Sequence, residues 1–346
     1  MSGQTSKLPL STYISSSTDI TGISLKPSHL ITKAPVTGPV TPYTPPKYSI
    51  ATLKTEIENG KPPKEIMAEV NTAPYSRVRV PSASELRVEA LRTGFSLLDR
   101  NRFLKKNRPN VAMIAAHSGH GKTALLMQIA MEVAKEGPVF VHSFEMDNRD
   151  LITRMIATYG GCTANEILDG TADPDWLADC ARQLSELQLY LCDEIQSQMI
   201  FVEQACLDAK QKYGKSPLIV LDYVQQIEDN KQGAEWEILK RIMRRLQVMS
   251  RRFETNVLIG CQLNNKILNR DAENESAKFR PRVDDLAGGK KTLDACDSVM
   301  VIVRPELFDG SRPREADVFC LKNRGGEIFK GTWGWVGKYT KFIERK

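Results

Sequence analysis

The feature that most constrains the fold is a glycine-rich segment at residues 116–123, which reads Ala-His-Ser-Gly-His-Gly-Lys-Thr. An apolar strand candidate (111–115) precedes it directly, and a helical pattern (124–135) follows it. Backbone N–H groups of such a loop close around phosphate oxygens, and the start of the helix adds partial positive charge. One position departs from the usual pattern, because Ala116 stands where the first glycine is expected. The segment predicts a P-loop that binds a nucleotide.

Two side chains of this P-loop have predicted roles. We expect Lys122 to neutralise the β- and γ-phosphates and Thr123 to ligate Mg²⁺, so the predicted cofactors are ATP and Mg²⁺. The residues of the segment expected to contact the nucleotide are Ser118, Gly119, His120, Gly121, Lys122, Thr123 and Ala124. The alternative is a chance Gly-Lys-Thr in a turn, which the strand before it and the helix after it disfavour.

Further strand candidates define the fold class. Apolar runs at 139–143, 187–192, 218–222, 257–261 and 298–303 alternate with helical patterns. This alternation predicts an α/β fold with a mainly parallel sheet, right-handed crossovers and helices on both faces. Two later runs, 318–321 and 331–336, predict a C-terminal β-hairpin or a pair of edge strands. In such sheets ligands bind at the carboxyl ends of the strands.

Three polar residues stand at these strand ends. Glu145 follows 139–143, and we expect it one strand over from the P-loop, where it would orient and deprotonate the attacking water. An acid favoured by a helix dipole is an equally good interpretation. Asp222 ends 218–222 like a Walker B acid that holds Mg²⁺, with a solvated strand-end acid as the alternative. Gln262 follows 257–261, and its amide can donate to the γ-phosphate.

The composition is typical of a globular protein. Of the 346 residues, 41% are hydrophobic and 26% are charged, and the net charge of +6 permits binding to a polyanion without requiring it. The seven cysteines form no Cys-x-x-Cys pair, which disfavours a zinc or disulfide framework and favours a reducing compartment. No run approaches 18 apolar residues, so we expect no membrane partner. The predicted location is the cytoplasm.

Composition also divides the chain. Residues 1–47 are rich in Ser, Thr, Pro and Gly and predict a disordered tail. Such a segment is weakly typical of a transit peptide, but the first arginine is Arg77. Residues 48–84 predict a linker, in which two short amphipathic helices (48–70) would dock on a neighbouring subunit. The folded domain is expected at 85–346.

Several ordered motifs resemble the DnaB-type replicative helicases, including those of phage and plasmid type. The entry segment is Leu91-Arg92-Thr93-Gly94-Phe95, and Ser-Phe-Glu-Met at 143–146 resembles the family's Ser-Leu-Glu-Met. The remaining motifs, in family order, are 165–170 with Asp175-Trp176, Leu-Asp-Tyr-Val-Gln at 221–225, Gln-Leu-Asn at 262–264, Asp285-Leu286, 294–297, Arg-Pro-Glu at 304–306 and Lys-Asn-Arg-Gly-Gly at 322–326. The likeness spans about residues 85–345, and we expect the family's globular N-terminal domain to be lacking.

The resemblance implies a RecA-like ATPase that works as a hexameric ring and moves 5′ to 3′ on single-stranded DNA as a helicase in replication. It implies that Glu145 activates water, that Gln262 senses the γ-phosphate, and that Lys322 and Arg324 reach a neighbour's nucleotide across the subunit interface. From the residues alone, these two cations are solvated hairpin charges. Implied partners are single-stranded DNA, further copies of the chain, and a helicase loader or primase. The implied location is the cytoplasm of a bacterial cell or of a phage-infected host. The alternatives are a filament-forming recombination or repair ATPase and a loader-type ATPase that acts on another protein.

Two loops are expected to contact DNA. The first spans 228–235 and contains Lys231. The second is Ala287-Gly288-Gly289-Lys290-Lys291, where paired glycines permit close approach to phosphates and two lysines attract them. Ala287 replaces the arginine usual in the family, so the contacting residues stay open. A flexible surface loop is the alternative.

A long amphipathic helix is predicted at 235–254. Its apolar stripe, which we expect in the core, consists of Trp236, Leu239, Ile242, Met243, Leu246, Met249 and Phe253. Its opposite face carries Lys240, Arg241, Arg244, Arg245, Arg251 and Arg252. We favour solvated or subunit-interface charge over nucleic-acid contact for this basic face.

Overall fold

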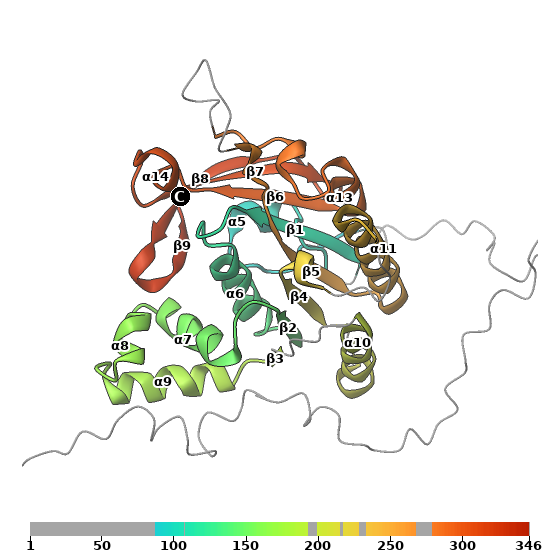
Figure 1. Ribbon diagram of the computed structural model, residues 1–346. Helices are drawn as coiled ribbons and strands as arrows, with labels where there is room; N and C mark the ends of the chain where they lie inside the picture. The colour runs from blue at the N-terminus through green and yellow to red at the C-terminus, as the bar shows by residue number, and fades with distance from the viewer. Residues whose placement is uncertain are drawn as a thin grey trace, which may run out of the picture. The chain divides into compact units, whose positions relative to one another are not determined.

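The computed structural model describes residues 87–106, 108–192, 199–214, 217–227, 233–267 and 279–345. In these residues nine strands form one sheet, and Figure 1 labels each of them. In spatial order they are β3 (Leu189–Cys192), β2 (Val139–Ser143), β4 (Leu218–Asp222), β5 (Asn256–Gln262), β1 (Asn110–Ala116), β6 (Ser298–Val303), β7 (Glu315–Asn323), β8 (Lys330–Val336) and β9 (Lys341–Glu344). The first six are parallel, and the last three add in antiparallel fashion.

Helices cover both faces of the sheet. Alternate residues of β1 point to opposite sides: Ala112 and Ile114 enter one apolar core, and Val111 and Met113 enter the other. The first core contains residues of α6 (Lys122–Val133), α7 (Asn148–Thr158), α8 (Ala164–Leu168) and α9 (Pro174–Ser185). The second contains residues of α10 (Met199–Tyr213), α11 (Glu235–Phe253) and α13 (Lys290–Ala295). Two further helices are short: α5 (Ser96–Arg100) and α14 (Glu306–Asp309).

Helix starts follow from local side-chain chemistry. The carboxylate of Asp147 accepts from the N–H of Asp150 at the start of α7. Thr163 and Glu166 form a reciprocal capping box at the start of α8, and Asp173 caps α9 just before Pro174. These caps satisfy backbone N–H groups that a helix start leaves unpaired. The fold class predicted from the sequence is confirmed, and so are the predicted strands.

Two structural features differ from expectation. The chain adds β9, which the sequence pattern did not indicate, so the predicted hairpin of β7 and β8 is internal to the sheet. The expectation that Glu145 lies one strand over from the P-loop is wrong, because β4 and β5 both stand between β2 and β1. Strand order depends on which helix crosses which face, and a local sequence pattern does not carry that information.

Some predictions lie outside the described residues. The tail at 1–47, the linker at 48–84 and Lys231 are among them. Within the part of the chain that the structure describes, no helix has the length and apolarity needed to cross a membrane. All seven cysteines lie within the described ranges and carry free thiols, and six of them are buried.

A buried histidine makes stability depend on pH. His142 in β2 is fully enclosed, and its Nε2 has no hydrogen-bond partner in the described residues. Burial lowers the pKa of His142 from 6.5 to about 4. In the unfolded chain this imidazole therefore binds a proton below about pH 6.5. In the folded chain it binds one only below about pH 4. Stability from this group is present above pH 6.5 and is lost as pH falls towards 4.

We predict that wild-type protein loses up to roughly 3 kcal/mol from this residue between pH 7 and pH 4. A His142→Leu variant should lose less stability over that interval, measured by urea unfolding at several pH values. The control is Val141→Ala, a neighbouring buried and uncharged site, which should lower stability equally at each pH. Parallel pH profiles for wild type and His142→Leu would contradict the assignment.

Candidate functional site

The P-loop lies between β1 and α6 and is shaped by two glycines with left-handed backbones. Gly119 has φ +78°, and Gly121 has φ +92°. A Cβ on Gly121 would lie 2.7 Å from Phe342 and 3.2 Å from Trp335, both side chains of the C-terminal strands. A side chain at position 121 is therefore excluded both by conformation and by space. The P-loop backbone is held against β8 and β9.

Three polar groups meet beside the P-loop. Asp222 ends β4 and is 1% exposed, and one of its carboxylate oxygens forms an ion pair with the ammonium of Lys122. The other oxygen accepts from the hydroxyl of Thr123 at 2.6 Å. Lys122 also lies over the ring of Tyr223, 4.6 Å from its centroid. The structure thus brings the predicted phosphate-binding lysine together with both predicted metal ligands.

The space for this contact comes from Gly260 in the neighbouring strand β5. A Cβ at this position would lie 2.8 Å from an Asp222 carboxylate oxygen and 3.2 Å from the Lys122 side chain. It would also lie 3.1 Å from Leu126 of α6. Sequence reasoning missed Gly260, because a glycine inside an apolar run has no partner until the strand order is known.

We predict that Gly260→Ala forces Lys122 and Asp222 apart. Overpacking of a buried site costs roughly 1–3 kcal/mol of folding stability, and displacement of these two groups by about 1 Å should lower ATP turnover by roughly 100-fold. The measurement is steady-state ATPase activity together with thermal melting. The matched control is Gly334→Ala in β8, where an added Cβ would lie 3.6 Å from its nearest neighbour. Equal turnover in the two variants would contradict this role.

A buried arginine holds the P-loop from the opposite side. Arg304 follows β6, and its guanidinium donates to the carbonyl oxygen of Gly119 at 3.0 Å. The same group pairs with Glu306 and lies over Trp335, 4.5 Å from the ring centroid. Its backbone N–H donates to Nδ1 of His120 at 2.9 Å. Burial, with the charges of His117 and Arg304, lowers the pKa of His120 to about 4, which keeps Nδ1 free to accept.

We predict that Arg304→Lys raises KM for ATP more than it lowers kcat. An ammonium cannot keep both the Gly119 contact and the paired contacts to Glu306, because it lacks the planar fork. Loss of a charged hydrogen bond worth about 1.5–3 kcal/mol corresponds to roughly a 10- to 100-fold rise in KM. The control is Arg312→Lys, a half-exposed arginine paired with Asp317. A fall in kcat at unchanged KM would count against a positioning role.

Two further predicted catalytic residues lie at the ends of β2 and β5, the strands on either side of β4. Glu145 is exposed just past β2, and β2 is anchored to β4 there because the N–H of Phe144 donates to the Asp222 carbonyl at 2.9 Å. Gln262 is the last residue of β5. The side-chain amide of Gln225 donates to the Gln262 carbonyl at 2.9 Å. Gln225 ends the Leu-Asp-Tyr-Val-Gln motif quoted above, but no role of its own was predicted for it. Its signal was position: it lies in the turn η2 (Val224–Gln226), directly after the strand that carries Asp222.

The segment after Gln262 connects this site to the second predicted DNA loop. Leu263 forms an antiparallel bridge with Leu286. The N–H of Asn264 donates to the Asp285 carbonyl at 2.9 Å, and its side chain donates to the Asp284 carbonyl at 2.7 Å. Gly288 and Gly289 follow with positive φ values of 73° and 55°, and Lys290 and Lys291 are exposed at the start of α13. The nucleotide-side strand end and this loop are therefore one hydrogen-bonded unit.

The hairpin cations lie away from these residues. Lys322 donates to the carbonyls of Leu293 and Asp294 at the end of α13, at 2.8 and 3.3 Å. Burial and the neighbouring Arg324 lower the pKa of Lys322. Arg324 forms an ion pair with Asp297 at 3.3 Å, and half of its side chain is exposed.

The hairpin turn that presents Arg324 is tightly held. Asn323 donates to the carbonyls of Asn101 and Glu327 at 2.7 and 3.0 Å. A Cβ on Gly325 or Gly326 would lie 2.5 Å from a backbone oxygen of the 101–102 segment. The Asn-Arg-Gly-Gly sequence therefore gives a turn packed directly on backbone.

Sheet polarity separates this turn from the P-loop. β7 is antiparallel to β6, so Asn323 lies opposite Ser298 at the start of β6. Ala116, which leads into the P-loop, lies opposite Ile302 near the end of β6. At a strand rise of roughly 3.3 Å per residue, the two positions are about 13 Å apart along the sheet. The turn and the P-loop leave the sheet in opposite directions, so Arg324 cannot reach the P-loop of its own chain.

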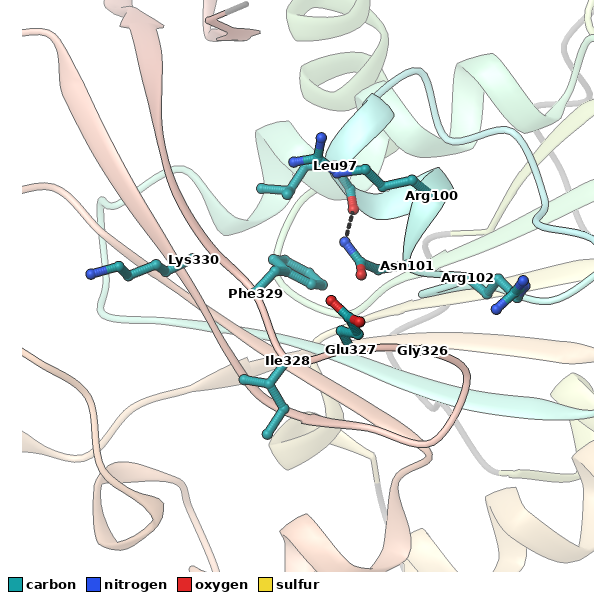
Figure 2. A pocket seen from close by; sticks show the side chains of 9 residues that line it. All are labelled: Leu97, Arg100, Asn101, Arg102, Gly326, Glu327, Ile328, Phe329 and Lys330. Atoms are coloured by element: carbon teal, nitrogen blue, oxygen red, sulfur yellow. Dashed lines mark hydrogen bonds between the residues drawn. The ribbon is translucent and has the colours of Figure 1, made fainter.

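A cavity of about 450 Å³ lies beneath the hairpin turn. Figure 2 shows its lining, where Phe329 lies near the centre and the side chains of Lys330 and Arg102 extend to opposite sides. Asn101 donates to the Leu97 carbonyl at 2.8 Å across one wall. This cavity belongs to the hairpin end of the sheet and contains no P-loop residue.

The family model for the DnaB-like helicase C terminal domain matches residues 90–344, which include both the P-loop and the hairpin. The chain belongs to this DnaB-like family. It is 25% identical over 281 residues to the replicative DNA helicase DnaB of Geobacillus stearothermophilus, covering 78% of this chain and 60% of that protein. It is 26% identical over 266 residues to the replicative DNA helicase DnaC of Bacillus subtilis, covering 74% and 57%.

Solved structures of DnaB-like proteins share the fold. One solved ATPase domain superposes with a TM-score of 0.69 at 22% identity, covering 86% of this chain and 99% of that one. A DnaB-like replicative helicase, solved in a study of its interactions with primase, superposes with a TM-score of 0.71 at 24% identity, covering 86% and 75%. The fold is therefore the RecA-like one expected. This DnaB-like chain spans about 60% of the length of the curated relatives named above.

Proposed function

We propose that this chain is an ATP hydrolase and DNA helicase that moves along single-stranded DNA as a ring of identical subunits, in replication. The observation that carries the proposal is the placement of Arg324 at the opposite end of the sheet from its own P-loop. A half-exposed guanidinium on a tightly held turn is suited to act on a nucleotide bound by another copy. Head-to-tail contacts of this kind generate rings when the rotation closes.

The described residues fit the cofactors ATP and Mg²⁺. Lys122 provides a cation, and the P-loop, in which Gly119 and Gly121 have left-handed backbones, provides backbone N–H groups for phosphate oxygens. The hydroxyl of Thr123 and the carboxylate of Asp222 are the hard oxygen donors that Mg²⁺ prefers, and this metal usually takes only one or two protein ligands. The described residues contain no cluster of three or more His, Cys, Asp or Glu side chains for another kind of metal site. Mg²⁺ would neutralise charge that develops on the phosphates.

The chain's own residues then have these roles. Lys122 leaves Asp222 to bind the β- and γ-phosphates, which frees the carboxylate and Thr123 to hold the metal. Glu145, exposed at the end of β2 with two strands between β2 and β1, orients the attacking water and accepts its proton. Gln262 senses the γ-phosphate from β5, between these two groups. Lys322 and Arg324 of an adjacent copy stabilise the charge that develops during transfer.

Movement on DNA requires the ATP site to act on a DNA loop. The bridge from Leu263 to Leu286 and the bonds from Asn264 to residues 284 and 285 provide a direct connection. A shift of Gln262 on hydrolysis would therefore move the loop that carries Gly288, Gly289, Lys290 and Lys291. Polarity of 5′ to 3′ and a sixfold ring follow the family resemblance, and a loader or primase is the proposed protein partner.

The test mixes two inactive variants. Lys122→Ala lacks the P-loop cation, and Arg324→Ala lacks the hairpin cation. Alone, Arg324→Ala should lose roughly 10³-fold of DNA-stimulated ATP turnover. An equal mixture assembled together should recover roughly a quarter of wild-type activity, because random head-to-tail assembly pairs an intact P-loop with an intact hairpin at one interface in four. Unwinding of forked DNA and native mass are measured on the same samples.

The control is Arg345→Ala. Arg345 matches Arg324 in exposure, 53% against 51%, and each holds one carboxylate. This variant should retain wild-type activity. Two results together would contradict a site shared between two copies: no recovery of activity in the mixture, and full ATP turnover by wild-type monomers. Open filaments in electron micrographs, without unwinding, would replace the helicase with a recombination-type ATPase.

A further inference from the structure

Trp236 is the second residue of the long helix α11. Unlike the rest of the apolar stripe expected in the core, its side chain is exposed. The other six residues of that stripe are all buried. Trp236 is 48% exposed, and Gly233, Ala234 and Glu235 before it are exposed as well. The period of the helix would place Trp236 with the buried residues, but no described strand or helix covers it. Its expected core position is therefore wrong.

The indole meets one of the two loop lysines. The ammonium of Lys291 lies 3.9 Å from the centroid of the Trp236 ring. This contact joins the start of α11 to the start of α13, which lie side by side in Figure 1. A cation on an indole face is worth about 0.5–1 kcal/mol at an exposed site, which is less than burying a tryptophan contributes. An exposed Trp-Lys pair therefore retains apolar surface that a ligand can cover.

Contacts between α11 and the segment that contains α13 fix the positions of Trp236 and Lys291. A Cβ on Gly288 would lie 2.5 Å from the Thr292 hydroxyl and 3.2 Å from Leu239, so the loop backbone lies directly against α11. Gln247 of α11 donates to the Ala295 carbonyl at 2.7 Å at the other end of α13. With both ends of α13 fixed, the positions of Trp236 and Lys291 are set by packed structure.

The pair lies on the nucleotide side of the sheet. α11 begins after the end of β4, and the segment just before α13 bridges Leu263, one residue past the end of β5, so both helix starts are at the carboxyl ends of the parallel strands. Asp284 and Asp285, shortly before this loop, accept the two hydrogen bonds from Asn264. A ligand on the pair is therefore connected to the strand end of Gln262.

The surrounding charges favour a ligand with both a flat ring and a phosphate. Lys290 and Lys291 are exposed cations, whereas Glu235 and Glu237 flank the indole in sequence and Asp294 is exposed on α13. Glu237 lies beside Arg241 near Gly233. The acids disfavour phosphate at the start of α11, so phosphate is drawn towards the lysines while the indole stays available for stacking. Bases stack on aromatic side chains without regard to sequence.

We propose that Trp236 and Lys291 form a contact for one nucleotide of single-stranded DNA, in which the indole stacks on an unpaired base and the ammonium neutralises the adjoining phosphate. This inference rests on the proposed function and names the residues that contact the bases. It extends the expected DNA site from a loop that recognises only the backbone to one that also holds a base.

The experiment measures binding of a fluorescein-labelled oligo(dT) strand, by anisotropy, to full-length protein with a non-hydrolysable ATP analogue. A second strand of equal length has abasic sites in place of bases. Trp236→Ala should bind oligo(dT) about 5- to 100-fold more weakly than wild type. Trp236→Phe should restore most of the affinity. Lys291→Gln should reduce the salt dependence of binding by about 0.7 in log–log slope, the value for one phosphate of a single strand.

The abasic strand separates stacking from a folding defect. Wild type should bind it about as weakly as Trp236→Ala does, and Trp236→Ala should bind both strands alike. The matched control is Val248→Ala, an apolar residue on the same helix that is 58% exposed, which should bind like wild type. Equal loss on both strands, or wild-type affinity in Trp236→Ala, would overturn the contact while leaving the helicase proposal intact. Absence of DNA binding by wild type would instead overturn the proposed function itself.

Discussion

The contact of Lys122 and Thr123 with Asp222 is the interaction on which the rest of the site depends. It joins the start of α6 to the end of β4, although another strand separates β4 from β1. Only a residue without a side chain at position 260 of that strand leaves room for the contact. Two buried charges are costly unless they are paired, so the ion pair holds the start of α6 and the end of β4 together.

The C-terminal strands support the P-loop as well as extending the sheet. Trp335 and Phe342 pack against the P-loop at Gly121, and Arg304 holds the Gly119 carbonyl while resting on Trp335. The family match through residue 344 is consistent with this arrangement. The same strands reverse direction, which places the Arg324 turn at the far end of the sheet. One structural addition thus stabilises the chain's own P-loop and directs a cation away from it.

Gln262 and the loop at 287–291 are joined by hydrogen bonds, which is the connection that the proposed movement on DNA requires. Gln225 fixes the Gln262 backbone, and the following residues bond to the 284–286 segment. The loop then packs its glycine backbone on α11, beside the Trp236-Lys291 pair. Backbone and side-chain hydrogen bonds thus connect the end of β5 to the loop without a break.

The sequence by itself determined the P-loop, the predicted strands and the α/β class, because phosphate binding and strand burial impose local patterns of glycine and apolar residues. It also identified Asp222, Glu145 and Gln262 by their places at strand ends. Only the tertiary structure decided that two strands lie between Glu145 and the P-loop, that Gly260 and Arg304 shape the site, and that Trp236 extends beyond the core. Those facts depend on which segments become neighbours, and neighbours distant in the chain leave no periodic signal in either one.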